Sequence, residues 1–295
     1  MQDRIGKIHK EVQKMVRANT GKSALILKPI LYVCLAIWLV FSIFPFYWLI
    51  VSATRDTASI FAYPPHLTFG NQFLKNARDL FAAIPFLKSM WNSLYVAGLS
   101  TALSLFFCSL AGFSFAKFDF PGKKPLFLIM LGTMMIPTQL NMVPMFVVMK
   151  SLHWVNTLTA LIVPSAASAF GIFWIRQSCE SSLPDDLLHA GRIDGCGNFR
   201  LYFHVALPTL RPALAALGIF NFMGAWNDYM WPLVILNDPN KYTLQVMLST
   251  LNGIYFKDYG MVMVGTLFAT IPLVILFFIF SRKLMGAVTI GAIKS

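Results

Sequence analysis

Charged side chains are scarce in this sequence. Asp, Glu, Lys and Arg make up 12% of its 295 residues, whereas 57% of the residues are hydrophobic. A typical soluble globular domain carries about 25% charged residues. The shortage excludes an ordinary soluble domain, because a solvated surface needs more charge than this chain supplies. We therefore predict an integral membrane protein.

The sequence also lacks the motifs of metal, nucleotide and catalytic sites. Its four cysteines show no CxxC spacing and its five histidines show no HExxH spacing, so neither a zinc site nor a disulfide framework is expected. Val16 stands where a phosphate-binding loop ending in Gly21-Lys22-Ser23 needs its first glycine, and Arg200 replaces the third glycine of a GxGxxG. We expect no catalytic residues, no metal and no cofactor bound by this chain.

Long apolar runs take the place of these motifs. A bilayer core requires about 20 apolar residues of a helix, and five stretches without any charge meet this length: residues 29–54, 90–116, 125–149, 151–175 and 259–281. A sixth stretch, residues 212–237, is interrupted only by Asp228. The sequence predicts an all-α integral membrane protein with six transmembrane helices and both termini on one side.

The distribution of basic residues predicts the orientation. Of the 24 lysines and arginines, seventeen lie before the first span, in the second and fourth loops, or after the last span. Basic residues are retained on the cytoplasmic side of a membrane, so both termini are expected to be cytoplasmic. Since no basic patch with interleaved aromatic residues lies outside the spans, the net charge of +12 does not indicate nucleic-acid binding.

Residues 1–28 form a basic tail ahead of the membrane domain of residues 29–295. Basic and apolar side chains each recur in it every three or four positions and fall on largely opposite faces of a helix. Two alternatives stay open, an amphipathic helix on the anionic inner leaflet or a loose basic tail. The first apolar stretch is longer than the h-region of a signal peptide, so we expect it to remain as the first span.

The loop of residues 178–212 combines charges of both signs between two apolar spans. Ser182 is expected to cap a helix with Pro184 in its first turn, where Asp185 and Asp186 suit the positive end of the helix dipole. The helix should run to about Asp194. Gly195 is then a stop signal, and Asn198 is expected to cap a second short helix.

One face of this predicted helix suits a protein partner. Leu187, Ala190 and Ile193 form an apolar stripe, and small residues nearby (Ala190, Gly191 and Gly195) permit the close approach of another backbone. Insertion into a groove of a partner is favoured over a helix lying on lipid, because three aspartates of this segment (Asp185, Asp186 and Asp194) would face anionic lipid headgroups.

Polar and aromatic residues gather in the stretch of residues 212–237, namely Asn221, Trp226, Asn227, Asp228 and Trp231. An ionisable residue at membrane depth generally faces a cavity or a partner, which makes this group a candidate substrate pathway. The alternative is a belt of aromatic residues at the outer interface. Three prolines in the stretches of residues 125–149 and 259–281 interrupt backbone hydrogen bonding and fit either helices bent around a pathway or packing kinks. They are Pro137, Pro144 and Pro272.

The run LPDDLLHAGRIDGC from Leu183, followed by ALPTLRP from Ala206, resembles the EAA motif of ATP-binding-cassette (ABC) importer permeases. IP at Ile136, VP at Val143, AWNDYMWP from Ala225 and GAIK from Gly291 extend the resemblance to the second permease subunit of the maltose-type carbohydrate family. It implies a bacterial-type cytoplasmic membrane, a heterodimer with another permease, an ATPase dimer that binds ATP and Mg²⁺, a solute-binding protein and a carbohydrate substrate. The loop helix then corresponds to the coupling helix, with Asp185, Asp186, His189, Ala190, Gly191, Asp194 and Gly195 as its coupling residues.

The chain departs from this family where Glu-Ala-Ala is usual, because it has His189-Ala190-Gly191. Asp185 and Asp186 precede His189 by four and three residues on the same helix face, and we expect them to supply the missing acidic charge. The resemblance also implies that the outer loops, residues 55–88 and 237–258, meet the binding protein. Two alternatives remain open: a permease of this superfamily for a non-sugar solute, and a secondary transporter independent of ATP.

Overall fold

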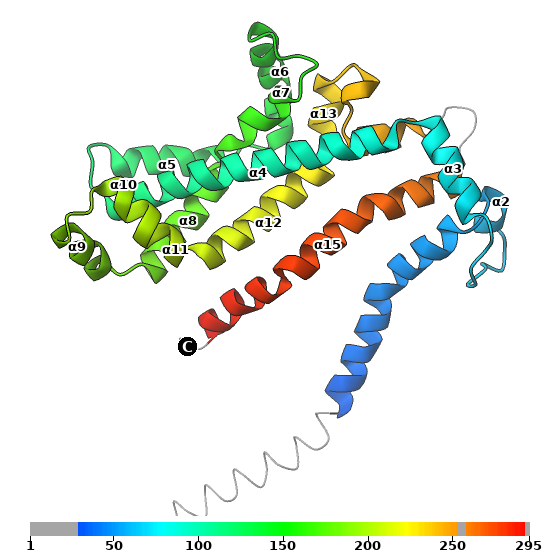
Figure 1. Ribbon diagram of the computed structural model, residues 1–295, viewed down its shortest axis with the longest axis horizontal. Coiled ribbons are helices and arrows are strands. Elements are labelled where there is room, and N and C mark those ends of the chain that lie inside the picture. Colours follow the sequence, from blue (N-terminus) through cyan, green and yellow to red (C-terminus); the bar gives the residue numbers. More distant parts are fainter. Residues whose placement is uncertain (1–28, 253–257, 293–295) are drawn as a thin grey trace, which may run out of the picture.

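A computed structural model of the chain describes residues 29–252 and 258–292 (Figure 1). Every regular element in these ranges is helical, which confirms the predicted all-α class. The basic tail, with its two alternative conformations, lies outside the described residues. After a first helix at Pro29–Ala53, the elements are α2 (Thr57–Ile60), α3 (Phe73–Ala83), α4 (Phe86–Lys117), α5 (Lys123–Thr133), η1 (Thr138–Asn141), α6 (Met142–Ser151), α7 (Thr159–Ile162), η2 (Val163–Ala166), α8 (Ala169–Ser182), α9 (Asp185–Ile193), α10 (Asn198–Leu201), η3 (Tyr202–Ala206), α11 (Leu207–Thr209), α12 (Arg211–Asn227), α13 (Met230–Ile235), η4 (Pro239–Lys241), α14 (Leu244–Thr250) and α15 (Tyr259–Ala292).

Helix α4 is the axis on which the body of the molecule is assembled. Helices α8 and α12 pack along it, and α15 packs against α3 and α12 (Figure 1). The inward side of α4 carries small polar residues, all of them buried: Ser89, Ser93, Ser100, Ser104 and Ser109. Small side chains let neighbouring helices approach closely when both are surrounded by lipid, so the serine-rich face explains why α4 is central.

The first helix stands apart from this body (Figure 1). Its side chains are exposed or partly exposed as far as Ile50, and burial begins at Val51. The end of the helix is tied down by the buried Asn76, whose Nδ2 donates to the Ala53 carbonyl (3.1 Å) and the Arg55 carbonyl (2.8 Å). Most of this helix therefore presents apolar side chains outward.

Four helices are long and apolar enough to cross a membrane: Pro29–Ala53, Phe86–Lys117, Thr159–Ser182 and Tyr259–Ile279. Two further candidates are bent pairs, Lys123–Thr133 with Thr138–Ser151 (96°) and Asn198–Thr209 with Arg211–Asn227 (79°), so the number of spans is six if each pair counts as one. The break in the first pair ends at Pro137, the residue that caps η1, as expected of a proline that bends a span.

Three predicted spans need correction. The third, predicted at residues 125–149, is broken between α5 and η1 and bent by 96°. The fourth was predicted at residues 151–175, but the chain turns after Ser151 through His153 and Asn156, which have positive φ angles of 58° and 60°, and the long helix covers residues 159–182. Residues 212–237 do not form one continuous helix either, because α12 ends at Asn227 and α13 begins at Met230. Hydropathy alone does not register these turns, since the residues that form them are mostly uncharged.

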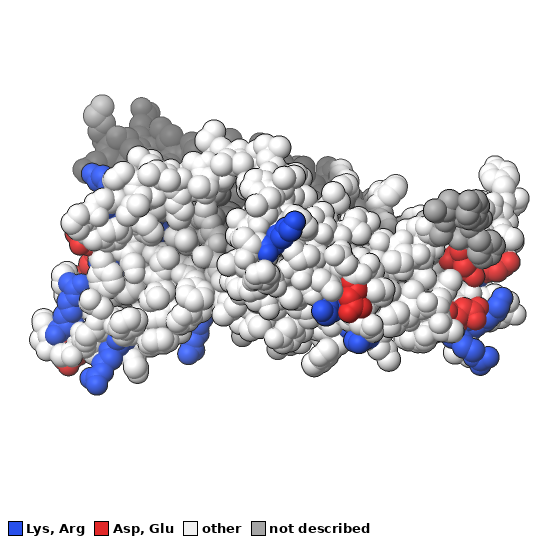
Figure 2. Space-filling view, turned by 90° about the horizontal axis from the view of Figure 1, so that it is seen from above, with Lys and Arg blue, Asp and Glu red and all other residues white. Residues whose placement is uncertain are grey.

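Charged side chains gather at the two ends of the long axis (Figure 2). One group lies at the end that holds α2 and α3, and another at the end that holds α9 and α10, with a few more near the middle. The surface between these groups is largely uncharged, as expected of a face that contacts lipid.

Candidate functional site

Helix α9 lies at one extremity of the molecule, beyond the end of α8 (Figure 1). Asp185 and Asp186 occupy its first turn as predicted, and Gly195 ends the segment with φ +80°. The predicted caps are wrong by one or two residues. Ser182 is the last residue of α8 and Pro184 is the N-cap of α9, while Gly197 rather than Asn198 is the N-cap of α10.

The two faces of α9 have different roles. Leu188 is buried in a cluster with Leu183 and Leu201, so this side anchors the helix to the body. A Cβ atom on Gly191 would lie 2.5 Å from Leu201 Cδ2, so glycine here serves packing within the chain rather than the approach of a partner. On the opposite face the predicted apolar stripe is confirmed as exposed: Leu187 is 49% and Ile193 87% exposed.

One acidic residue of α9 is paired within the chain, whereas other polar residues of the segment are exposed to the surroundings. Lys117 Nζ, at the end of α4, lies 2.7 Å from Asp185 Oδ1, and the lysine side chain is only 8% exposed. The hydrogen bond and the charge of Lys117 lower the pKa of the Asp185 carboxyl below its ordinary value of 3.8. Asp186, His189 and Asp194 remain exposed. Asp186 is thus better placed than Asp185 to meet a partner's positive charge.

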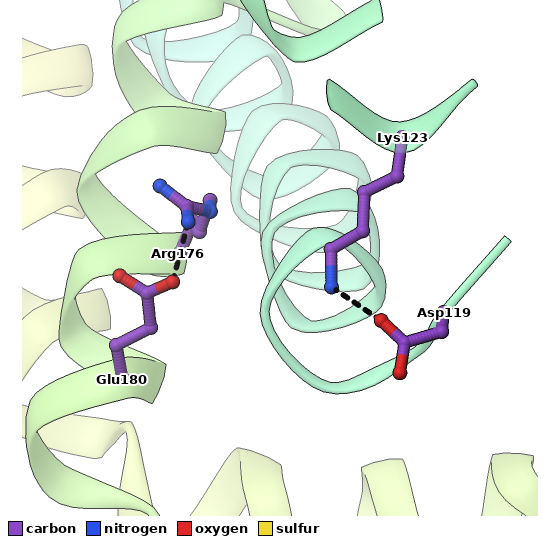
Figure 3. Close-up of polar contacts among 4 residues, drawn as sticks. All are labelled: Asp119, Lys123, Arg176 and Glu180. Atoms are coloured by element: carbon purple, nitrogen blue, oxygen red, sulfur yellow. Dashed lines mark hydrogen bonds and ion pairs between the residues drawn. The ribbon is translucent and has the colours of Figure 1, made fainter. Parts of the chain in front are cut away.

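Two local ion pairs lie on and next to the helices that precede α9 (Figure 3). Arg176 and Glu180 pair along α8 at 2.5 Å, and Lys123 at the start of α5 reaches Asp119 at 3.3 Å. The Arg176 guanidinium also lies 4.2 Å from the centroid of the Phe127 ring on α5, a cation–π geometry. The cation–π contact therefore joins α5 to α8 close to the start of the loop of residues 178–212.

The predicted pathway residues fall on both sides of α12. Asn221 donates through Nδ2 to Ser104 Oγ (2.9 Å), and Asp228 Oδ1 accepts from the Trp231 backbone N–H (3.4 Å). Both side chains line a cavity of about 400 Å³ that α12 shares with α4, η2 and the residues around Ser168. Ser100, which also lines it, has a buried hydroxyl without a hydrogen-bond partner among the described residues.

Trp226 and Asn227 line a different cavity, of about 540 Å³, between α12, α14 and α15. The Trp226 side chain is 1% exposed and stacks on Phe222, with ring centroids 5.9 Å apart and an interplanar angle of 12°. Asn227 donates through Nδ2 to the Met223 carbonyl, one turn back along the helix. The structure therefore divides four of the five predicted residues between two separate cavities.

Trp231 lines neither of these cavities. Its Nε1–H donates to the Ala160 carbonyl on α7 (3.0 Å), and its ring packs on the cluster that contains Met149 and Ile162. It serves helix packing in this structure. Four further lining residues were not predicted from the sequence: Ser100, Ser104, Gln245 and Thr270. The recurrence of Ser93, Ser100 and Ser104 at helical spacing is nevertheless a signal for a polar face on α4.

The two cavities beside α12 are lined by hydrogen-bonding and apolar side chains. Among the residues that the structure describes, no group of three or more His, Cys, Asp or Glu side chains is arranged to hold a metal ion. The larger cavity is lined by amide, hydroxyl and indole groups together with apolar side chains, and Asp228 is the one carboxylate among the described residues that line the smaller.

Comparison with known proteins gives the family. The family described as "Binding-protein-dependent transport system inner membrane component" matches residues 107–288. The lactose transport system permease protein LacG of Rhizobium radiobacter is 34% identical over 253 residues, 86% of this chain and 91% of LacG. The arabinooligosaccharides transport system permease protein AraQ of Bacillus subtilis (strain 168) is 31% identical over 260 residues, 85% of this chain and 90% of AraQ.

A solved structure supports the fold. A chain of a bacterial ABC transporter involved in the import of the acidic polysaccharide alginate superposes with a TM-score of 0.77 and covers 88% of this chain and 97% of that one, at 21% identity. At this identity the likeness concerns the fold. Because the family match spans more than half of the sequence and LacG aligns over nearly its whole length, the chain belongs to the family of binding-protein-dependent transport system inner membrane components.

Proposed function

We propose that this chain is one of two permease subunits of an ATP-driven importer for an oligosaccharide or a related carbohydrate. It crosses a bacterial-type cytoplasmic membrane six times, each bent pair counting as one span, with both termini in the cytoplasm. A solute-binding protein delivers the substrate outside. An ATPase dimer binds ATP and Mg²⁺ and docks on α9, so this chain itself catalyses no reaction.

The exposed apolar face of α9 carries this proposal. Ile193 is 87% exposed and Leu187 is 49% exposed, although the opposite face of the same short helix is anchored by the buried Leu188. Apolar side chains held outward on an anchored helix, with the exposed Asp186 beside them, suit insertion into a groove of a protein partner. The membership of the chain in a family of transport components supports an ATPase as that partner.

Carbohydrate is favoured as the substrate class by two observations. LacG and AraQ are named for lactose and for arabinooligosaccharides. In addition, the described lining residues of the two cavities beside α12 include no lysine or arginine, whereas phosphate recognition relies on arginine or lysine. A phosphate ester is therefore the less suitable occupant.

The contacts of α9 indicate how movement would reach the membrane. Gly191 packs on Leu201 of α10, and Asp185 pairs with Lys117 at the end of α4. The Trp174 indole of α8 donates to the Ala213 carbonyl of α12 (3.0 Å). A push on α9 is thus passed to α4 and α12 as a rigid-body displacement, the usual form of such transitions.

The test is purification of the tagged chain in mild detergent from its own membranes, with mass spectrometry of its partners and an ATPase assay. We expect an ATPase, a second permease and a binding protein. Ile193→Lys should remove the ATPase while keeping the second permease, because lysine places a charge in the apolar contact. Leu67→Lys is the matched control, since Leu67 is 53% exposed and lies in the loop of residues 55–88 at the other end.

Two results would contradict the proposal. Retention of the ATPase by Ile193→Lys at the level of Leu67→Lys would show that α9 is not the docking helix. Recovery of the chain alone, able to move a sugar in vesicles without ATP, would replace the importer with a secondary transporter.

A further inference from the structure

A polar cavity of about 270 Å³ lies where the end of α4, the start of α5 and the helix α9 meet. Most of its lining residues carry ionisable side chains, namely Lys117, Asp119, Lys123, Asp185, His189 and Arg192. Lys117 is the last residue of α4 and Lys123 is the first of α5, and both helices belong to candidate membrane spans. A cavity at the ends of two spans lies at the depth of the lipid headgroups.

The positive charges of this cavity outnumber the negative ones. Lys117 pairs with Asp185 at 2.7 Å, and Lys123 pairs with Asp119 at 3.3 Å (Figure 3). Arg192 forms no ion pair with any described residue, so its guanidinium charge is left uncompensated. One surplus positive charge matches a singly charged phosphodiester, and arginine recognises phosphate through paired hydrogen bonds.

The two carboxylates are more exposed than the lysines that pair with them. The Lys117 side chain is 8% exposed and that of Asp185 70%, whereas Lys123 is 25% and Asp119 104% exposed. Charges in solvent are screened more strongly than buried ones, so the cations dominate the field inside the cavity. No side chain caps the N-terminus of α5, and the partial positive charge of a helix N-terminus adds to this field.

An apolar helix face continues from the cavity into the membrane. Leu126, one turn after Lys123 on α5, is 52% exposed, and Leu128 and Ile129 are 66% and 67% exposed. Side chains of this kind on a spanning helix suit contact with acyl chains. The cavity itself is smaller than the roughly 300–1,000 Å³ of sites that enclose a whole ligand, so it has room for a headgroup while the rest of a lipid stays outside.

We propose that this cavity binds the headgroup of an anionic phospholipid, with the Arg192 guanidinium donating to the phosphate oxygens, Lys123 adding positive charge, and an acyl chain lying along Leu126. Basic pockets between transmembrane helices are a recurrent form of headgroup site. The exposed face of α9 stays available to a protein, because Asp186 and Ile193 do not line the cavity. The proposal requires only that the chain spans a bilayer, so it is independent of the proposed importer.

The experiment uses the full tagged chain, with any subunits that accompany it, stripped of its lipid in mild detergent. The probe is dioleoylphosphatidylglycerol. Dioleoylphosphatidylethanolamine is the zwitterionic comparison, and glycerophosphoglycerol is the same headgroup without acyl chains. Thermal unfolding at rising probe concentrations gives the half-saturating concentration, because a ligand of the folded state stabilises it.

Three variants isolate the role of the guanidinium. Arg192→Gln removes the charge, and Arg192→Lys keeps the charge but loses the paired hydrogen bonds. Arg200→Gln is the matched control, since Arg200 is likewise exposed, lies on the neighbouring α10 and does not line the cavity.

We expect phosphatidylglycerol to stabilise the wild-type chain, and the other two probes to have little effect at the same concentration. Arg192→Gln should raise the half-saturating concentration of phosphatidylglycerol by about tenfold, the effect of lost hydrogen bonds to a charged group. Arg192→Lys should fall between this variant and the wild type, and Arg200→Gln should stay within about twofold of the wild type.

Four results would overturn the proposal. An equal loss in Arg192→Gln and Arg200→Gln, about fivefold each, would show diffuse surface attraction without a site. Equal stabilisation by phosphatidylethanolamine would remove the requirement for an anionic lipid. Equal stabilisation by glycerophosphoglycerol would make the occupant a soluble phosphodiester. Loss of a copurifying ATPase from Arg192→Gln, with phosphatidylglycerol binding unchanged, would assign the cavity to that protein instead.

Discussion

The crossing of α4 and α8 yields the sharpest stability prediction. A Cβ atom on Gly112 would lie 2.8 Å from Ile175 Cβ and 2.9 Å from the Arg176 backbone nitrogen. Restoring an ordinary contact of 3.4 Å would require α8 to move away by about 0.6 Å. Because the obstacle includes backbone, rotation of one side chain cannot remove it. Overpacking of this kind costs about 1–3 kcal/mol, whereas alanine gains about 1 kcal/mol over glycine in a helix interior.

The clash should therefore outweigh or at least cancel the gain in Gly112→Ala. Gly98 provides a matched control on the same helix, since a Cβ atom there meets nothing within 4 Å, and Gly98→Ala should show the helix gain alone. The difference in stability between the two variants then measures the cost of the clash, about 1–3 kcal/mol, or roughly 3–9 °C in melting temperature. Thermal unfolding of the detergent-solubilised chain measures it. A Gly112→Ala variant as stable as Gly98→Ala would refute the close crossing.

Three further changes test the contacts around the site. Asp185→Asn should lower the melting temperature at pH 7, and the difference from the wild type should disappear as the pH falls below 3.8. The hydrogen bond from Lys117 and then its charge lower the pKa of the folded carboxyl, so the pair stabilises the fold above the ordinary pKa and this stabilisation is lost as the acid is protonated. Trp231→Phe should lower stability by about 1 kcal/mol, the value of its hydrogen bond, without changing sugar moved per ATP. Asn76→Ala should cost about 1–3 kcal/mol and expose the end of the first helix to protease.

The membrane class and the coupling segment could be predicted from the sequence because their signals are local. A run of about 20 apolar residues requires a helix in lipid, and two aspartates before an apolar stripe with a glycine after it set the start and stop of α9. The caps were placed wrongly because α8 extends to Ser182. Serine suits a cap wherever a helix begins, but the sequence does not show that the preceding helix still occupies it.

The partners of individual side chains could not be predicted, because they come from distant parts of the chain. Asp185 and Asp186 are equivalent in sequence, yet the end of α4 places Lys117 against Asp185 alone. The sequence similarly predicted that Gly191 is a small residue accessible to a partner, whereas in the structure Leu201 fills the space in front of it. In both cases the deciding atom belongs to another element whose position depends on the packing of the whole domain.

The division of the pathway residues follows from the geometry of α12. Trp226 follows Asn221 by five residues, and Asp228 follows Asn221 by seven. At 100° per residue, Asn221 and Asp228 therefore lie on the same side of the helix axis, and Trp226 lies on a different side. The helix is 17 residues long, about 26 Å, and begins beside the coupling loop at Leu210, which is 1% exposed. A displacement of that buried end carries both faces of the helix together. The α12 residues that line the two cavities would therefore move together when that end is displaced.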